Sequence, residues 1–203
     1  MESELEGCTG FSEGVNVKFV KKCISIITCT SLIALGLVGC MPNDKEIISK
    51  SLDNTFAKMK SLDAEFVNSI ENSPSGSDMT ELGINSAEFL SAFLEGMSYE
   101  IGEIKVDGNT ATAQLSVTSK RMSEIITNFD TSSLSYIESV PISNLSDEEL
   151  QTDLTDILFS ETKNTLPVTS NHTLDFELSE NIWALTESSQ KLLEEIVFGT
   201  QAA

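Results

Sequence analysis

The sequence predicts an α+β fold class: a curved antiparallel sheet with helices packed on one face. Two stretches alternate apolar and polar residues, and each contains a two-residue turn that would fold it into a hairpin. Apolar residues recur every three or four positions before and after the first hairpin, which predicts helices there. The order helices, hairpin, helices, hairpin is typical of an α+β domain.

The start of the chain is typical of an exported protein. Lys18, Lys21 and Lys22 precede residues 24–38, a segment that carries no charge. A membrane-spanning helix needs roughly 20 apolar residues, whereas the core of a signal peptide needs about 7 to 15. The length of the segment therefore favours a signal peptide. Glutamates are frequent before the lysines, so we hypothesise that translation begins near Val15 or Val17.

The segment ends at Leu37-Val38-Gly39-Cys40. This tetrapeptide resembles the lipobox of bacterial lipoproteins. The resemblance implies cleavage between Gly39 and Cys40 and attachment of a diacylglyceryl group, with fatty acyl chains such as palmitate, to the Cys40 thiol. Two acyl chains give durable anchoring, whereas one gives marginal binding. An uncleaved short anchor and a chance cysteine are the alternatives.

Cys40 separates the expected signal peptide from the expected folded domain. We expect a signal peptide over residues 1–39, a lipidated tether over 40–43 and a single α+β domain over 44–199, which is long enough for a hydrophobic core. We expect the protein at the outer face of the plasma membrane of a bacterium, and we expect this bacterium to be Gram-positive. All four cysteines lie within the first 40 residues, so disulfides and thiol catalysis are excluded after Cys40.

Acidic residues dominate the part of the chain after Cys40. Four of the 32 acidic and three of the 12 basic side chains lie in the first 40 residues, so 28 acidic and nine basic ones remain. Such a surface repels phosphate backbones and anionic lipid headgroups. We therefore expect no nucleic-acid partner, and membrane attachment only through the lipid on Cys40.

The first helices are predicted from caps and spacing. Asn43 or Asp44 caps a helix whose apolar positions recur over 48–70, with a break near Ser61. Residues 72–78, rich in Ser, Pro and Gly, are predicted to form a surface loop. A second helix is expected from Ser86.

The first hairpin is predicted over residues 99–118. Residues 110–118 alternate strictly between apolar and polar side chains, as a half-buried strand does. Asp107-Gly108 is the predicted turn, which would pair Ile104 with Ala111. The alternation slips upstream of Ile104, so we expect a bulge at Gly102.

Helical spacing returns from Met122, and a further helix is expected to begin at Ser146. Ser146 and Glu149 have the spacing of a capping box. Pro167 ends any helical continuation.

A second hairpin follows, with Glu180-Asn181 as its turn. That turn would pair Leu178 with Trp183 and Phe176 with Leu185. A short last helix is expected around residues 192–197, with Gly199 as its stop.

The two hairpins carry a second resemblance. Residues 99–118 are similar to the first hairpin of small bacterial lipoproteins whose domain of unknown function has a nuclear-transport-factor-2-like, or cystatin-like, fold. The last hairpin of that family carries Gly-Lys-Trp; here Trp183 matches, while Asn181 and Ile182 replace the Gly and the Lys. The resemblance implies a cone-like domain.

Few residues have the type and spacing of a catalytic or metal-binding site. His172 is the single histidine, and it is expected at the sheet margin rather than in catalysis. Phosphate-binding glycine loops and Gly-x-Ser-x-Gly are absent from the sequence. We expect no metal site and no cofactor.

These observations favour a non-enzymatic binding or scaffold module of the cell envelope, which takes a small apolar ligand in the concavity of the sheet or meets an envelope protein. The candidate pocket residues are Tyr99, His172, Phe176 and Trp183, although Trp183 is also expected in the core. The fold analogy raises an alternative, a pocket enzyme of the ketosteroid-isomerase or dehydratase type that uses Tyr99, Tyr136 or His172. A self-assembling structural protein, with an exposed apolar patch, is a third hypothesis.

Overall fold

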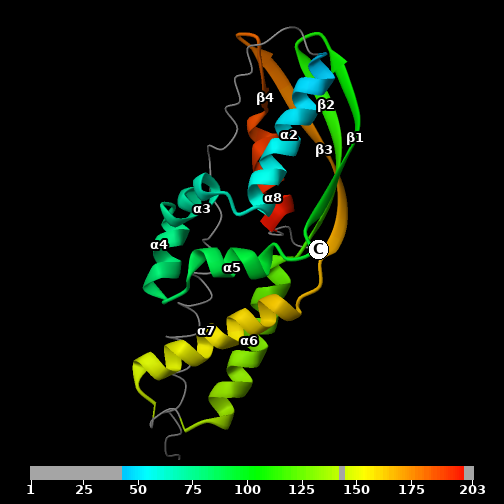
Figure 1. Ribbon diagram of the computed structural model, residues 1–203. Coiled ribbons are helices and arrows are strands. Elements are labelled where there is room, and N and C mark those ends of the chain that lie inside the picture. The colour runs from blue at the N-terminus through cyan, green and yellow to red at the C-terminus, as the bar shows by residue number, and fades with distance from the viewer. Residues whose placement is uncertain (1–42, 142–144, 199–203) are drawn as a thin grey trace, which may run out of the picture.

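The computed structural model describes residues 43–141 and 145–198 of the chain. Within them, seven helices and four strands form an α+β domain, which confirms the predicted class (Figure 1). The signal segment, Cys40 and Gly199 lie outside the described residues. The elements are α2 (Asp44–Lys60), α3 (Ala64–Glu71), α4 (Pro74–Glu81), α5 (Ser86–Phe93), β1 (Ser98–Asp107), β2 (Thr110–Ser119), α6 (Met122–Ser139), α7 (Asp147–Asn164), β3 (Val168–Ser179), β4 (Ile182–Leu185) and α8 (Glu187–Phe198).

The four strands form one antiparallel sheet in the order β1-β2-β3-β4. Helix α2 contacts β1 and helix α8 contacts the other three strands, and both helices lie on the same side of the curved sheet (Figure 1). We call this side the inner face and the opposite side the outer face. Strand β2 alternates as predicted, because its inner-face residues are buried and its outer-face residues are not. The buried ones are Ala111, Ala113, Leu115 and Val117.

The first hairpin has the predicted faces but a shifted turn. Asp107 pairs with Thr110 and Ile104 with Ala113, so the two turn residues are Gly108 and Asn109 rather than Asp107 and Gly108. Gly108 has φ +59°, and a hairpin turn with a positive φ at its first central position favours glycine there. The predicted pairing of Ile104 with Ala111 was wrong by two residues, which leaves every side chain on its predicted face.

The predicted bulge at Gly102 is confirmed. The register of β1 against β2 shifts between Ile101, which pairs with Leu115, and Ile104, which pairs with Ala113. Two residues of β1, Gly102 and Glu103, therefore lie opposite one residue of β2. A bulge of this kind bends the strand and increases its twist.

The second hairpin is confirmed in register and turn. Phe176 pairs with Leu185 and Leu178 with Trp183. Glu180 and Asn181 have φ values of +52° and +62°, as both central residues of a type I′ turn must.

The predicted surface loop over 72–78 was wrong, because helix α4 begins inside it at Pro74. The side chain of Ser73 accepts a hydrogen bond from the backbone N–H of Gly76, and proline is well suited to the first position of a helix. The composition that suggested a loop is thus a helix start. A Cβ on Gly76 would lie 2.2 Å from the carbonyl oxygen of Ile70, so only glycine lets α4 pack this closely on the end of α3.

Four of the other helices, α2, α5, α6 and α7, begin where the sequence predicted, whereas α8 begins at Glu187, earlier than the helix expected around residues 192–197. Asn43 caps α2, which ends at Lys60 before the expected break. The side chains and backbones of Ser146 and Glu149 form the predicted capping box at the start of α7. Helix α5 starts at Ser86 and helix α6 at Met122, as expected.

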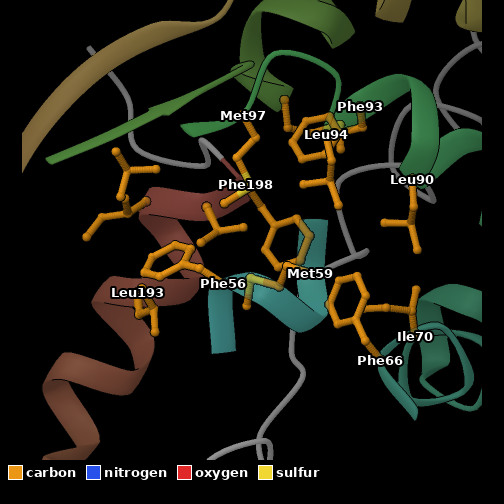
Figure 2. Close-up of a cluster of buried hydrophobic side chains, with 14 of the residues drawn as sticks. Phe56, Met59, Phe66, Ile70, Leu90, Phe93, Leu94, Met97, Leu193 and Phe198 are labelled. Carbon is orange, nitrogen blue, oxygen red and sulfur yellow. The ribbon is translucent and has the colours of Figure 1, made fainter. Parts of the chain in front are cut away.

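One apolar core joins helices from both halves of the chain. Figure 2 shows side chains of α2, α3, α5 and α8 that point toward one another. Phe93 of α5 stacks on Phe198 of α8, with ring centroids 6.0 Å apart. Each fully buried large apolar side chain stabilises the fold by about 1.5–3 kcal/mol. The labelled members are Phe56, Met59, Phe66, Ile70, Leu90, Phe93, Leu94, Met97, Leu193 and Phe198.

A buried lysine connects the end of β2 to two helices. Lys120 is 3 % exposed, and its Nζ donates hydrogen bonds to the carbonyl oxygens of Ala92 and Thr162, both at 2.8 Å. These carbonyls belong to the last turns of α5 and α7, where a helix leaves carbonyls without an internal partner and its dipole is negative. One ammonium group therefore caps two helix ends.

Candidate functional site

The four predicted pocket residues all lie on the inner face of the sheet. Tyr99 is paired with Val117 in β2, and His172 with Leu115. Phe176 and Trp183 are 2 % and 6 % exposed and belong to the core, as expected for Trp183. The topology thus brings the four residues to one face, where two of them are core residues.

Tyr99 has a structural partner on the neighbouring helix. Its ring stacks on Phe56 at a centroid distance of 4.3 Å, and its hydroxyl donates a hydrogen bond to Asp53 Oδ1 at 3.0 Å. Burial, followed by the hydrogen bond to Asp53, raises the pKa of Tyr99. The stacking and the hydrogen bond together join β1 to α2 through Tyr99.

His172 is half-buried in β3. Its Nε2 atom is buried and has no hydrogen-bond partner among the described residues. Burial lowers the pKa of His172 below its usual value of 6.5, because an imidazolium loses hydration there. The ring is therefore neutral at pH 7. Tyr136, a further candidate for the enzyme alternative, lies on α6, where its hydroxyl donates a hydrogen bond to Asp153 of α7.

Trp183 ties the start of α2 to the last hairpin. Its indole Nε1 donates a hydrogen bond to Asp44 Oδ1 at 3.0 Å. The backbone N–H of Leu178 donates to the carbonyl oxygen of Asn109 at 2.8 Å, which brings both hairpin turns to the same end of the domain. Asp44 is four residues after Cys40 in the sequence, and four extended residues span about 14 Å at most. Because of the lipid anchor expected on Cys40, we call the end of the domain that carries both hairpin turns and the start of α2 the anchor end.

A hollow opens on the outer face of the sheet, across β1, β2 and β3. Its volume is about 380 Å³. The hollow lies beside the bulge at Gly102, which is six residues before Gly108 of the hairpin turn. At 3.3 Å per residue this is about 20 Å along β1 from the anchor end. The outer-face residues that line it are Glu100, Gly102, Gln114, Ser116, Asn171 and Thr173.

The pairing of the strands explains why these side chains share the hollow. Ser116 pairs with Glu100 on one side and Asn171 on the other, and Gln114 pairs with Thr173 in the next outer-face row. Leu115 and His172 also line the hollow. Their side chains point to the inner face, because side chains alternate along a strand. These two residues therefore line the hollow with backbone atoms.

Gly102 makes room for the hollow. A Cβ at this position would lie 3.2 Å from Gln114 Cβ, which is tighter than ordinary van der Waals contact. The bulge thus places a residue without a side chain where an outer-face side chain would otherwise stand. Sequence reasoning found the bulge but missed the hollow, since alternation does not show which outer-face side chains enclose a space.

The polar groups of the hollow are unpaired within the described part of the chain. Glu100, Gln114, Ser116, Asn171 and Thr173 make no side-chain hydrogen bond or ion pair with other described residues. By contrast, Thr118 and Thr169, also on the outer face, bond to each other at 2.8 Å, and Lys105 pairs with Glu103 at 3.2 Å. The hollow therefore presents free donors and acceptors, with one carboxylate and no lysine or arginine among its lining.

The described residues contain neither a metal-binding cluster nor a membrane-spanning helix. No group of three or more His, Cys, Asp or Glu side chains in residues 43–141 and 145–198 is arranged to hold a metal ion. None of the helices described has both the length and the apolar character that crossing a bilayer requires.

Comparisons with known proteins give one structural similarity. No protein-family model and no curated protein matches the chain. The crystal structure of a candidate lipoprotein, ycdA from Bacillus subtilis, matches with a TM-score of 0.43 and 16% sequence identity, over 77% of this chain and 48% of that one. This chain thus spans about half the length of ycdA. A TM-score this low does not establish a shared fold, so nothing known of that protein is transferred to this chain.

Proposed function

We propose that the chain is a lipoprotein held at the outer face of a bacterial plasma membrane by acyl chains on Cys40. The observation that carries the proposal is the sequence Leu37-Val38-Gly39-Cys40 at the end of the uncharged segment 24–38. The position of helix α2 supports such an anchor, because α2 begins at Asp44, shortly after Cys40 in the sequence, and Asp44 is hydrogen-bonded to Trp183 of the last hairpin.

We propose further that the domain is a non-enzymatic binding module, with the outer face as its binding surface. The inner face, where the sequence suggested an apolar ligand, carries the core residues Phe176 and Trp183. The outer face carries the hollow and its unpaired polar groups. The cone-like, nuclear-transport-factor-2-like resemblance of the hairpins stays a prediction, and the binding proposal does not depend on it.

The enzyme alternative would use Tyr99 and His172 on the inner face. The hydroxyl of Tyr99 is engaged by Asp53, an exposed residue of α2, rather than by an inward carboxylate. We therefore expect no conversion of a β,γ-unsaturated ketosteroid to its conjugated ketone above the uncatalysed rate. Turnover that Tyr99→Phe or His172→Gln abolishes would contradict this.

Metabolic labelling with a radioactive fatty acid tests the anchor. Cells that express the wild-type chain, Cys40→Ala or Cys29→Ala are labelled and separated into membrane and soluble fractions. Cys29 lies in the segment expected to be removed, so Cys29→Ala is a matched control. We expect labelled, membrane-bound protein for the wild type and for Cys29→Ala, and no label on Cys40→Ala.

Mass spectrometry of the mature N-terminus completes the test. The expected N-terminal residue is Cys40 with a diacylglyceryl group. Fatty-acid label that persists on Cys40→Ala, or a wild-type N-terminus at another residue, would overturn the anchoring proposal.

A further inference from the structure

We propose that the outer-face hollow binds a neutral polyhydroxylated ligand, one or two rings of a saccharide. This inference deepens the binding function proposed above and rests on it. It does not rest on the lipid anchor, because the hollow and Cys40 are separate parts of the chain.

The size of the hollow fits a small ligand. Ligand pockets in proteins occupy roughly 300–1,000 Å³, and the hollow, at about 380 Å³, lies at the lower end of this range. It spans three strands of a hydrogen-bonded sheet, so its lining groups are held by backbone pairing rather than by loops. Because this backbone is already ordered, binding a ligand costs little backbone conformational entropy.

The chemistry of the lining selects against several ligand classes. An anion would meet the Glu100 carboxylate and would find no lysine or arginine in the lining to pair with. The strongly acidic domain would repel it as well. An apolar ligand would bury amides and hydroxyls without giving them partners. A metal ion would find one carboxylate in the lining, and the described residues contain no metal-ligating cluster.

A saccharide matches the groups that remain. Each sugar hydroxyl both donates and accepts a hydrogen bond. The amides of Gln114 and Asn171 offer donors and acceptors, the hydroxyls of Ser116 and Thr173 offer both, and Glu100 offers acceptors. Because none of these side chains has a partner among the described residues, a ligand would break no internal hydrogen bond on entering.

The position of the hollow suits a ligand that arrives from outside the membrane. The four residues from Cys40 to Asp44 can span about 14 Å at most, and Asp44 is hydrogen-bonded to Trp183 at the anchor end. The hollow lies on the outer face of the sheet, toward the ends of β1 and β3 that are farther from the hairpin turns. The anchor thus leaves it open to solvent.

Nuclear magnetic resonance of the full chain in detergent micelles tests the proposal. The probes are glucose, N-acetylglucosamine, cellobiose and chitobiose, with glucuronate as an anionic control. We expect saturation transfer to at least one neutral sugar, none to glucuronate, and backbone amide shifts confined to residues around Gly102, Gln114 and Asn171.

Variants of the hollow separate specific binding from weak surface contact. Gln114→Ala and Asn171→Ala should each weaken binding about three- to tenfold, as the loss of one or two hydrogen bonds predicts. Gly102→Ala should weaken it as well, because the added Cβ would crowd the side chain of Gln114, which lines the hollow. Thr112→Ala, on the outer face of β2 but outside the lining, is the matched control and should bind as the wild type does.

Three results would overturn the proposal. They are the absence of saturation transfer to every neutral sugar, amide shifts that map away from the hollow, and hollow variants that bind as well as Thr112→Ala while keeping native amide spectra. None of these results would affect the anchoring proposal, which the labelling of Cys40 tests separately.

Discussion

Replacing Lys120 by methionine is expected to destabilise the domain more than any other single lysine substitution among the described residues. Methionine has a similar length and preserves packing, but it cannot donate hydrogen bonds to the carbonyls of Ala92 and Thr162. A buried acceptor that loses its partner costs about 1–3 kcal/mol, so the two carbonyls together give about 2–6 kcal/mol. This is a large fraction of the stability of a typical domain, about 5–15 kcal/mol.

The electrostatics of the site explain why the carbonyls matter more than the charge itself. Burial lowers the pKa of Lys120, and the carboxylate of Glu95, 3.7 Å away, only partly offsets this. Burial thus disfavours the charged form, and the hydrogen bonds to the two carbonyls are what the ammonium group contributes to the fold. The Glu95 side chain is 71% exposed, so Glu95→Gln should cost less than about 1 kcal/mol.

Urea denaturation of the full chain, followed by circular dichroism, measures these effects. Lys120→Met should lower the midpoint without changing the slope, as a pure loss of stability does. Lys191→Met, at an exposed position of α8, is the matched control and should stay within about 0.5 kcal/mol of the wild type. A midpoint for Lys120→Met equal to that of Lys191→Met would refute the two-helix cap, and so would an equal loss from Glu95→Gln.

Three further predictions concern the sheet, a helix contact and the anchor end. His172 is the single histidine, so one imidazole resonance should titrate with a pKa below 6.5. Because the unfolded chain then binds more protons than the folded one, the free energy of unfolding should fall as the pH drops through the folded pKa. His172→Gln should remove this contribution to the pH dependence of stability. A resonance that titrates above 6.5 would show that the ring is not desolvated. Gly76→Ala should cost about 1–3 kcal/mol or more by pushing α4 away from α3, whereas exposed Ser77→Ala should cost little, and equal urea midpoints would contradict the close contact. Trp183→Phe should cost about 1 kcal/mol or more and speed hydrogen exchange at the start of α2, since Asp44 loses its partner; unchanged exchange there would mean that the bond does not hold the helix.

Local chemistry in the sequence was sufficient for most of the elements. The capping box at Ser146 and the turn at Glu180-Asn181 were predicted from neighbouring residues alone, because caps and tight turns depend on backbone groups a few positions away. The strict alternation of β2 fixed which side chains face the core. Alternation has a period of two, however, so it could not distinguish the real pairing of the first hairpin from one shifted by two residues.

Contacts between distant segments were beyond such reasoning. Lys120 bonds to Ala92 and Thr162, 28 and 42 residues away, and nothing near it in the sequence marks it as buried. The helix at Pro74 was mistaken for a loop because its composition resembles one, while its close contact with α3 depends on the fold.

The sequence by itself determined the α+β class, most element starts and the lipobox resemblance at Cys40, because these depend on local patterns and on the period of the apolar residues. Only the tertiary structure decided which face of the sheet is filled by the core and which face carries a hollow. It placed Phe176 and Trp183 of the predicted pocket within the core and opened a polar hollow on the opposite face. The physical reason is that a hollow forms where a bulge and three paired strands meet, and the register that brings them together is a property of the folded chain.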